Sequence, residues 1–169
     1  DPAALLAWVT TLPLVPVINL LGDGHPGIWS LFDQMALNVP TDEVLDWYYL
    51  KENLYKVAAT DAVLESLSSQ LWEGQLQKVL GQLAEIDNDS ARRFSAYLST
   101  NAGRIPNYRY YQMEGLPIGS GPVESWVKQI DDRLQVTGAQ WNEETLPQML
   151  KLRSAYLNHQ LDDFSSCRE

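Results

Sequence analysis

The stretch LVPVINLLGDGHPGIW, residues 14–29, decides the fold. Its first eight residues form an apolar run rich in β-branched side chains, and the glycine-flanked Asp23 closes that run. This is the pattern of a buried strand that ends in a turn. Pro26 then opens a helix, which the apolar periodicity extends from about residue 27 to 37. We therefore expect a strand and a helix joined by a short acidic turn.

The rest of the chain adds one more strand and a series of helices. Residues 43–50 begin as a strand and enter a helix at Trp47, and leucines at three- and four-residue steps predict three or four helices over 51–102. The other expected elements are a helix over 3–12, an extended aromatic-rich connector over 103–119, and helices over about 122–135 and 144–157. The prediction is an α/β fold that is predominantly helical.

The helical block interrupts the α/β part, so we divide the chain into three segments. Residues 1–50 hold the strand, helix, strand unit, residues 51–115 hold the helical insertion and connector, and residues 116–169 hold the last helices. We also expect the insertion to contact the α/β part at few points. No apolar run reaches the roughly eighteen residues that would indicate a membrane span.

Composition limits the function. The formal net charge is −10, which taken alone argues against a nucleic-acid surface, because phosphates are neutralised by clustered Lys and Arg. Cys167 is the single cysteine, so neither a disulfide framework nor a cysteine metal cluster is expected. A reducing, cytoplasmic compartment fits this cysteine usage.

Two carboxylates carry the candidate chemistry, and each also has a purely structural interpretation. Asp23 stands where the first strand ends, the edge at which open α/β sheets bind ligands, but an Asp in a tight turn also hydrogen-bonds its own backbone. Glu124, in GSGPVES (119–125), lies in the first turn of a helix, where a carboxylate stabilises the helix dipole. His25 is either a ligand or base, or a solvated turn residue.

At this point the sequence resembles a family. Residues 21–58, LGDGHPGIWSLFDQMALNVPTDEVLDWYYLKENLYKVA, and residues 115–158, GLPIGSGPVESWVKQIDDRLQVTGAQWNEETLPQMLKLRSAYLN, are similar to the C-terminal part of DDE transposases of bacterial insertion sequences. The nearest type is the Kra-like group, with Lre-like and Mutator-like enzymes more distant. The glycine-rich element before Glu124 and the pattern Asp-Gly-x(4)-Trp that starts at Asp23 carry the resemblance together.

The resemblance implies a partial RNase H-like core interrupted by an all-helical insertion. It implies that Asp23 is the second catalytic Asp and Glu124 the catalytic Glu, that both hold Mg²⁺ or Mn²⁺, and that the substrates are transposon-end and target DNA. Lys128, Arg133 and Trp141 are the candidate DNA contacts. A cytoplasmic, nucleoid-associated location follows, and a homo-oligomer is left open.

The sequence departs from the family pattern at two places. The first catalytic Asp and the DNA-binding region are expected upstream of Asp1, so the chain alone is expected to be inactive. Relatives often carry an Asp-x-x-His pattern shortly after the second Asp. Here that pattern would start at Asp46, and Tyr49 stands where the His is expected. The alternative function is a non-catalytic, transposon-derived interaction module, which the acidic charge favours.

Overall fold

The computed structural model describes residues 2–13, 15–35, 37–135, 138, 141, 142 and 144–160, apart from the side chains of Pro2 and Arg133. The elements in chain order are α1 (Pro2–Val9), β1 (Ile18–Gly22), α2 (Pro26–Gln34), β2 (Thr41–Leu45), α3 (Trp47–Leu54), α4 (Asp61–Trp72), α5 (Leu76–Ala84), α6 (Asp89–Thr100), the 3₁₀ helix η1 (Ala102–Arg104), α7 (Tyr108–Met113), α8 (Gly121–Leu134) and α9 (Leu146–Leu157). The part of the chain that the structure describes is predominantly helical and contains two parallel strands, which confirms the expected α/β class at that level.

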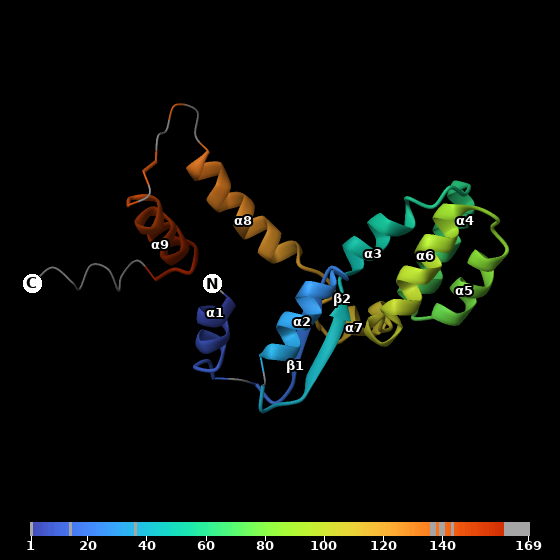
Figure 1. Cartoon of the computed structure of the whole chain (residues 1–169), viewed down its shortest axis with the longest axis horizontal. Coiled ribbons are helices and arrows are strands. Elements are labelled where there is room, and N and C mark those ends of the chain that lie inside the picture. The colour runs from blue at the N-terminus through green and yellow to red at the C-terminus, as the bar shows by residue number, and fades with distance from the viewer. Residues whose placement is uncertain are drawn as a thin grey trace, which may run out of the picture. The chain divides into compact units, whose positions relative to one another are not determined.

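Two compact units divide the described chain, a first unit of Asp1–Ser120 and a second unit of Gly121–Glu169. The first unit contains both strands and the helices up to α7, and the second contains α8 and α9 (Figure 1). The boundary lies inside the glycine-rich element that precedes Glu124.

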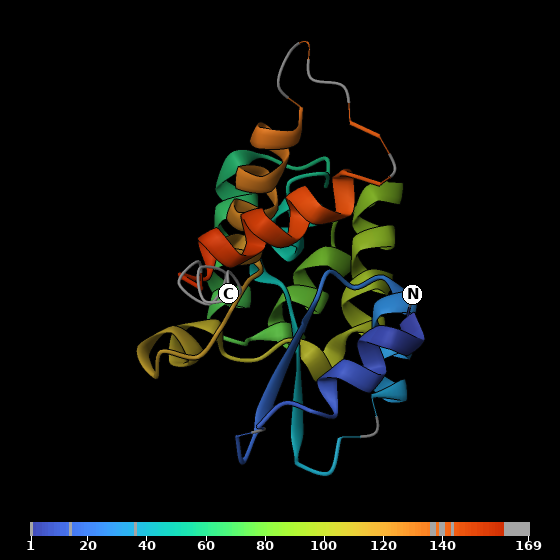
Figure 2. The same cartoon turned by 90° about the vertical axis from the view of Figure 1, so that its left-hand side faces the viewer.

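The two strands form a parallel pair in which Ile18 lies opposite Thr41 and Gly22 opposite Leu45 (Figure 2). Helix α2 connects them and packs the buried Trp29 ring directly over Gly22. A Cβ at Gly22 would lie 2.6 Å from that ring, so only glycine fits at the end of β1. The pairing brings the carboxyl ends of both strands to one edge of the sheet.

The helical block from residue 51 to 102 is confirmed. All of these residues are described, they form the last part of α3 together with α4, α5 and α6, and none of them lies in a strand. Helices α4, α5 and α6 pack against one another (Figure 1). Their buried side chains are Leu64, Leu67, Leu71, Val79, Leu83, Ala91, Phe94 and Leu98, at the three- and four-residue steps seen in the sequence.

The main contacts of helices α4, α5 and α6 are with one another, as expected for a block with few contacts to the sheet, but the block does not have a core of its own. The buried helix residues belong to the same hydrophobic cluster as Val44 and Leu45 of β2. Strand β2 continues into α3 after one residue, and Leu50 and Leu54 of α3 are fully buried, so the strand and the helices share one core. The helices are an insertion in sequence but part of the first unit in space.

The connector is also more ordered than expected. It contains η1 and α7, whose first residue Tyr108 is buried and donates a 2.7 Å hydrogen bond to the Leu45 carbonyl. The ring of Tyr108 lies 5.0 Å from that of Trp47, and Asn107 caps α7 through the backbone N–H of Tyr110. The segment that was expected to be extended therefore contains a short helix, which Tyr108 anchors against β2.

None of the helices within the described ranges is long and apolar enough to cross a bilayer.

Candidate functional site

The Asp23 turn begins directly after β1. Asp23 is exposed, and its Oδ1 accepts a 2.8 Å hydrogen bond from the backbone N–H of His25. This is the self-bonded turn that the structural interpretation predicts. This hydrogen bond orients the Asp23 side chain and leaves the carboxylate accessible to solvent. The same geometry would therefore also allow Asp23 to act as a metal ligand.

His25 caps the N-terminus of α2. Its Nδ1 accepts a 3.1 Å hydrogen bond from the backbone N–H of Gly27, which requires an unprotonated Nδ1. The sequence interpretation offered a ligand, a base or a solvated side chain and missed the cap. The signal was present, because Pro26 at the first helical position makes the preceding residue the cap.

Tyr97 of α6 holds the Asp23 turn from the helical side. Its hydroxyl donates a 3.3 Å hydrogen bond to the Asp23 carbonyl, and its ring packs under Gly24. Gly24 has φ +93°, and a Cβ there would lie 2.8 Å from the Tyr97 ring. Burial raises the pKa of Tyr97 to about 12, so the hydroxyl remains a donor at neutral pH. Nothing in the sequence marks this partner, which lies 74 positions from Asp23.

Asp46 follows β2 as Asp23 follows β1, but its role is different. The side chain is only 1% exposed. Its Oδ1 accepts hydrogen bonds from the backbone N–H groups of Tyr48 (2.8 Å) and Tyr49 (3.3 Å), which caps α3. Its Oδ2 accepts from the backbone N–H (2.6 Å) and the hydroxyl (2.7 Å) of Ser120. With four donors on two oxygens, this carboxylate is a structural anchor and not a metal ligand.

The glycine-rich element is held against this anchor. The backbone N–H of Trp47 donates a 2.9 Å hydrogen bond to the Ile118 carbonyl. A Cβ at Gly119 would lie 2.5 Å from the Tyr48 ring and 3.3 Å from Asp46 Oδ1. Gly119 is therefore required for close approach to α3, and residues 118–120 are fixed at the carboxyl end of β2.

Glu124 lies in the first turn of α8 and is exposed. It belongs to the second unit, whereas Asp23 belongs to the first. The resemblance implies that these two carboxylates hold the same metal ions and therefore lie close together, which stays a prediction.

The candidate DNA contacts all lie in the second unit. Lys128 is exposed on α8. Trp141 Nε1 donates a 2.7 Å hydrogen bond to the Leu134 carbonyl, so this indole caps the end of α8. The side chain of Arg133 lies outside the described residues.

The metal site was tested against the side chains present. Among the residues that the structure describes, no group of three or more His, Cys, Asp and Glu side chains is placed to hold a metal ion. Asp46, the other carboxylate at the sheet edge, already uses both of its oxygens. The hard oxygen donors of Asp23 and Glu124 suit Mg²⁺ by type.

Comparison of the chain with models of protein families, with curated proteins and with solved structures gave no match.

Proposed function

We propose that this chain is part of the catalytic core of a DDE transposase, an RNase H-like domain that cuts and joins DNA. Asp23 and Glu124 are its second and third catalytic carboxylates. The proposal requires a first Asp on a strand upstream of Asp1, and it takes the chain by itself to be inactive. It rests on the resemblance in residues 21–58 and 115–158 and on one structural observation, the anchoring of Ser120.

The anchoring supports the proposal through chain length. Ser120 is bonded to Asp46 at the carboxyl end of β2, and that end lies beside the end of β1, where Asp23 begins its turn. Glu124 follows Ser120 by four residues. A fully extended chain spans at most about 3.6 Å per residue, so the Cα atoms of Ser120 and Glu124 are at most about 14 Å apart. Chain length therefore allows the Glu124 side chain to reach this edge, as the proposal requires.

Divalent metal ions, Mg²⁺ or Mn²⁺, would activate the attacking oxygen and stabilise the leaving oxygen at the scissile phosphate when bound. The chain's own residues do the positioning. The Asx turn orients Asp23, Tyr97 holds the backbone of that turn, and the Asp46–Ser120 anchor sets the start of the segment that carries Glu124. Transposon-end and target DNA are the proposed substrates.

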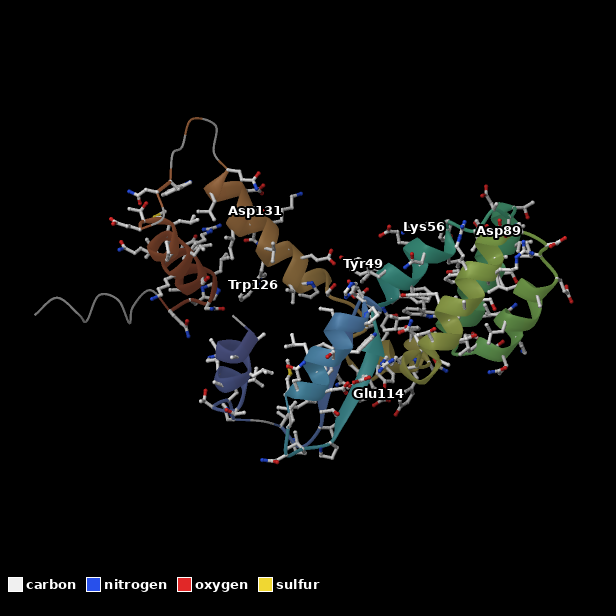
Figure 3. The ribbon with its side chains drawn as sticks, viewed as in Figure 1. Tyr49, Lys56, Asp89, Glu114, Trp126 and Asp131 are labelled. Carbon is white, nitrogen blue, oxygen red and sulfur yellow. The ribbon has the colours of Figure 1, made fainter. Side chains whose placement is uncertain are left out.

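The decisive experiment uses the full-length gene product with a transposon-end duplex and Mg²⁺. We expect metal-dependent strand cleavage that Glu124→Gln abolishes, because the amide has nearly the same shape but removes the negative charge from the site. Glu114→Gln is the matched control, because Glu114 is an exposed glutamate in the first unit (Figure 3), and cleavage should persist.

Two results decide against the proposal. Cleavage that survives Glu124→Gln would reduce Glu124 to a partner of the helix dipole. A full-length protein that lacks cleavage under all metal conditions would favour the alternative, a transposon-derived interaction module, which the net charge of −10 supports.

A further inference from the structure

A pocket of about 320 Å³ lies between the end of α3 and helix α6 in the first unit. Its lining consists of Asn53, Lys56, Ser90, Arg93, Phe94 and Tyr97. This described lining contains two cations and no carboxylate, although acidic residues outnumber basic ones by 22 to 12 in the chain. The pocket lining is therefore positively charged, whereas the protein as a whole has a net negative charge.

Hydrogen bonds tie the two sides of the pocket together. The Ser90 hydroxyl accepts a 2.9 Å hydrogen bond from the backbone N–H of Ala58, and the Asn88 side-chain amide donates 2.9 Å to the Ala58 carbonyl. These two contacts join the segment after α3 to the start of α6, where Figure 3 labels Lys56 and Asp89. The two backbone segments that border the pocket are thus held together before any ligand binds.

The two cations of the pocket are available to a ligand. Lys56 pairs with Glu52 at 2.9 Å, but both side chains are more than 60% exposed (62% and 63%), so this pair is weak and is exchanged at little cost. The acidic residues at the start of α6, Asp87 and Asp89, bind Arg92. Among the described residues Arg93 forms no ion pair, and its side chain lines the pocket.

Tyr97 connects the pocket to the candidate catalytic turn. The ring forms one wall of the pocket beside Phe94, with the ring centroids 6.1 Å apart. The hydroxyl of the same side chain donates to the Asp23 carbonyl. A group bound in the pocket is therefore linked to the Asp23 turn through the Tyr97 side chain, which contacts both.

We propose that this pocket binds a backbone phosphate of the DNA strand that is held at the Asp23 edge. The inference deepens the proposed transposase function and rests on it. Lys56 and Arg93 neutralise the phosphate, and the half-buried Tyr97 ring offers apolar surface to the adjoining nucleotide. The overall negative charge does not prevent this, because salt screens charges beyond about 8–10 Å at physiological ionic strength and the local cations then dominate.

The test measures the salt dependence of DNA binding by the 169-residue chain. Fluorescence anisotropy follows a labelled oligonucleotide of about twenty nucleotides, single-stranded in one series and duplex in another, over a range of salt concentrations. Each phosphate contact that is lost lowers the slope of log K against log salt by about 0.7 for single strands and 0.9 for duplex. We expect Lys56→Gln with Arg93→Gln to remove this one phosphate contact and so to lower the slope by about 0.7 for the single strand and about 0.9 for the duplex. Both side chains are exposed, so the variant should fold.

The control removes the same charge elsewhere. Lys78 and Arg109 are exposed on α5 and α7, outside the pocket, and Lys78→Gln with Arg109→Gln should leave the slope unchanged. The inference would be overturned if the slope fell by the same amount in the two double variants, or if the wild-type chain bound no DNA at any salt concentration. Displacement of DNA by inorganic phosphate at equal phosphate concentration would overturn the assignment to a DNA strand and indicate a free-phosphate site.

Failure of this inference and failure of the proposed function are distinguishable. If the full-length protein needs Glu124 for cleavage while the pocket variant binds DNA like the wild type, the pocket inference alone is wrong. If the pocket variant loses salt-dependent binding while Glu124→Gln leaves cleavage intact, the catalytic assignment alone is wrong.

Discussion

Asp46 Oδ2 accepts two hydrogen bonds from Ser120, a residue 74 positions further along the chain. The same carboxylate caps α3 through its other oxygen. One buried side chain therefore fixes both the start of the helical block and the end of the connector that returns from it. The hydrogen bonds of Ser120 and the close approach of Gly119 to α3 give both residues a structural role that does not depend on the role of Glu124.

We predict that Asp46→Asn destabilises the protein by about 2–4 kcal/mol, because the amide nitrogen cannot accept the hydrogen bonds of a buried carboxylate. Ser120→Ala removes one of the four bonds and should cost about 1 kcal/mol. Urea unfolding followed by circular dichroism measures both. Asp87→Asn, at a side chain that is 98% exposed, is the control and should leave the unfolding midpoint unchanged. A wild-type midpoint for Asp46→Asn would show that the negative charge of Asp46 is not needed.

Gly119→Ala should destabilise the protein by about 1–3 kcal/mol, because the new Cβ collides with the Tyr48 ring. Combined with Tyr48→Ala, the glycine substitution should cost less than about 0.5 kcal/mol, and a double-mutant cycle of unfolding free energies measures the coupling. Gly103→Ala is the control, since no heavy atom lies within 4 Å of its Cβ position. If the effects of Gly119→Ala and Tyr48→Ala on the unfolding free energy were additive, the collision would be ruled out as the cause.

The hydroxyl of Tyr97 should make stability depend on pH in the alkaline range. Its pKa is raised from 10.0 to about 12 in the folded protein, mainly by burial, so the folded state holds the proton more tightly than the unfolded chain. The stabilisation is complete below pH 10 and is lost as the pH rises from 10 towards 12. Between about pH 9 and pH 11 the wild type should lose more unfolding free energy than Tyr97→Phe. Parallel losses in the two proteins would contradict the assignment.

Metal binding by this chain should be weak, with a dissociation constant on the order of millimolar or poorer, because Mg²⁺ dehydrates reluctantly and the proposal assigns only Asp23 and Glu124 of this chain to the site. Titration calorimetry with Mg²⁺ and electron paramagnetic resonance with Mn²⁺ measure it. Asp23→Asn should weaken binding further, whereas Asp87→Asn should not. Micromolar affinity that survives Asp23→Asn would place the metal elsewhere on the chain.

The sequence was sufficient where the signal is local. The apolar run before Asp23 predicted β1, and the leucine periodicity over 51–102 predicted the helical block. Both predictions succeeded because a strand or helix that is buried on one side has apolar residues at a regular spacing along the chain. The acidic turn after β1 was likewise predicted from three adjacent residues and lies where expected. The prediction of an extended connector over 103–119 was wrong at α7, because this helix of six residues is too short to show a helical pattern in the sequence.

Only the tertiary structure decided which side chains serve which role. Asp23 and Asp46 both follow a strand, yet the first is exposed in its own turn and the second is buried under four hydrogen bonds. The partners that make this difference, Tyr97 for the Asp23 turn and Ser120 for Asp46, are each 74 positions away. Contacts over such distances depend on how the whole core closes, because a hydrogen bond forms only where folding brings donor and acceptor together, and no local spacing of residues records that.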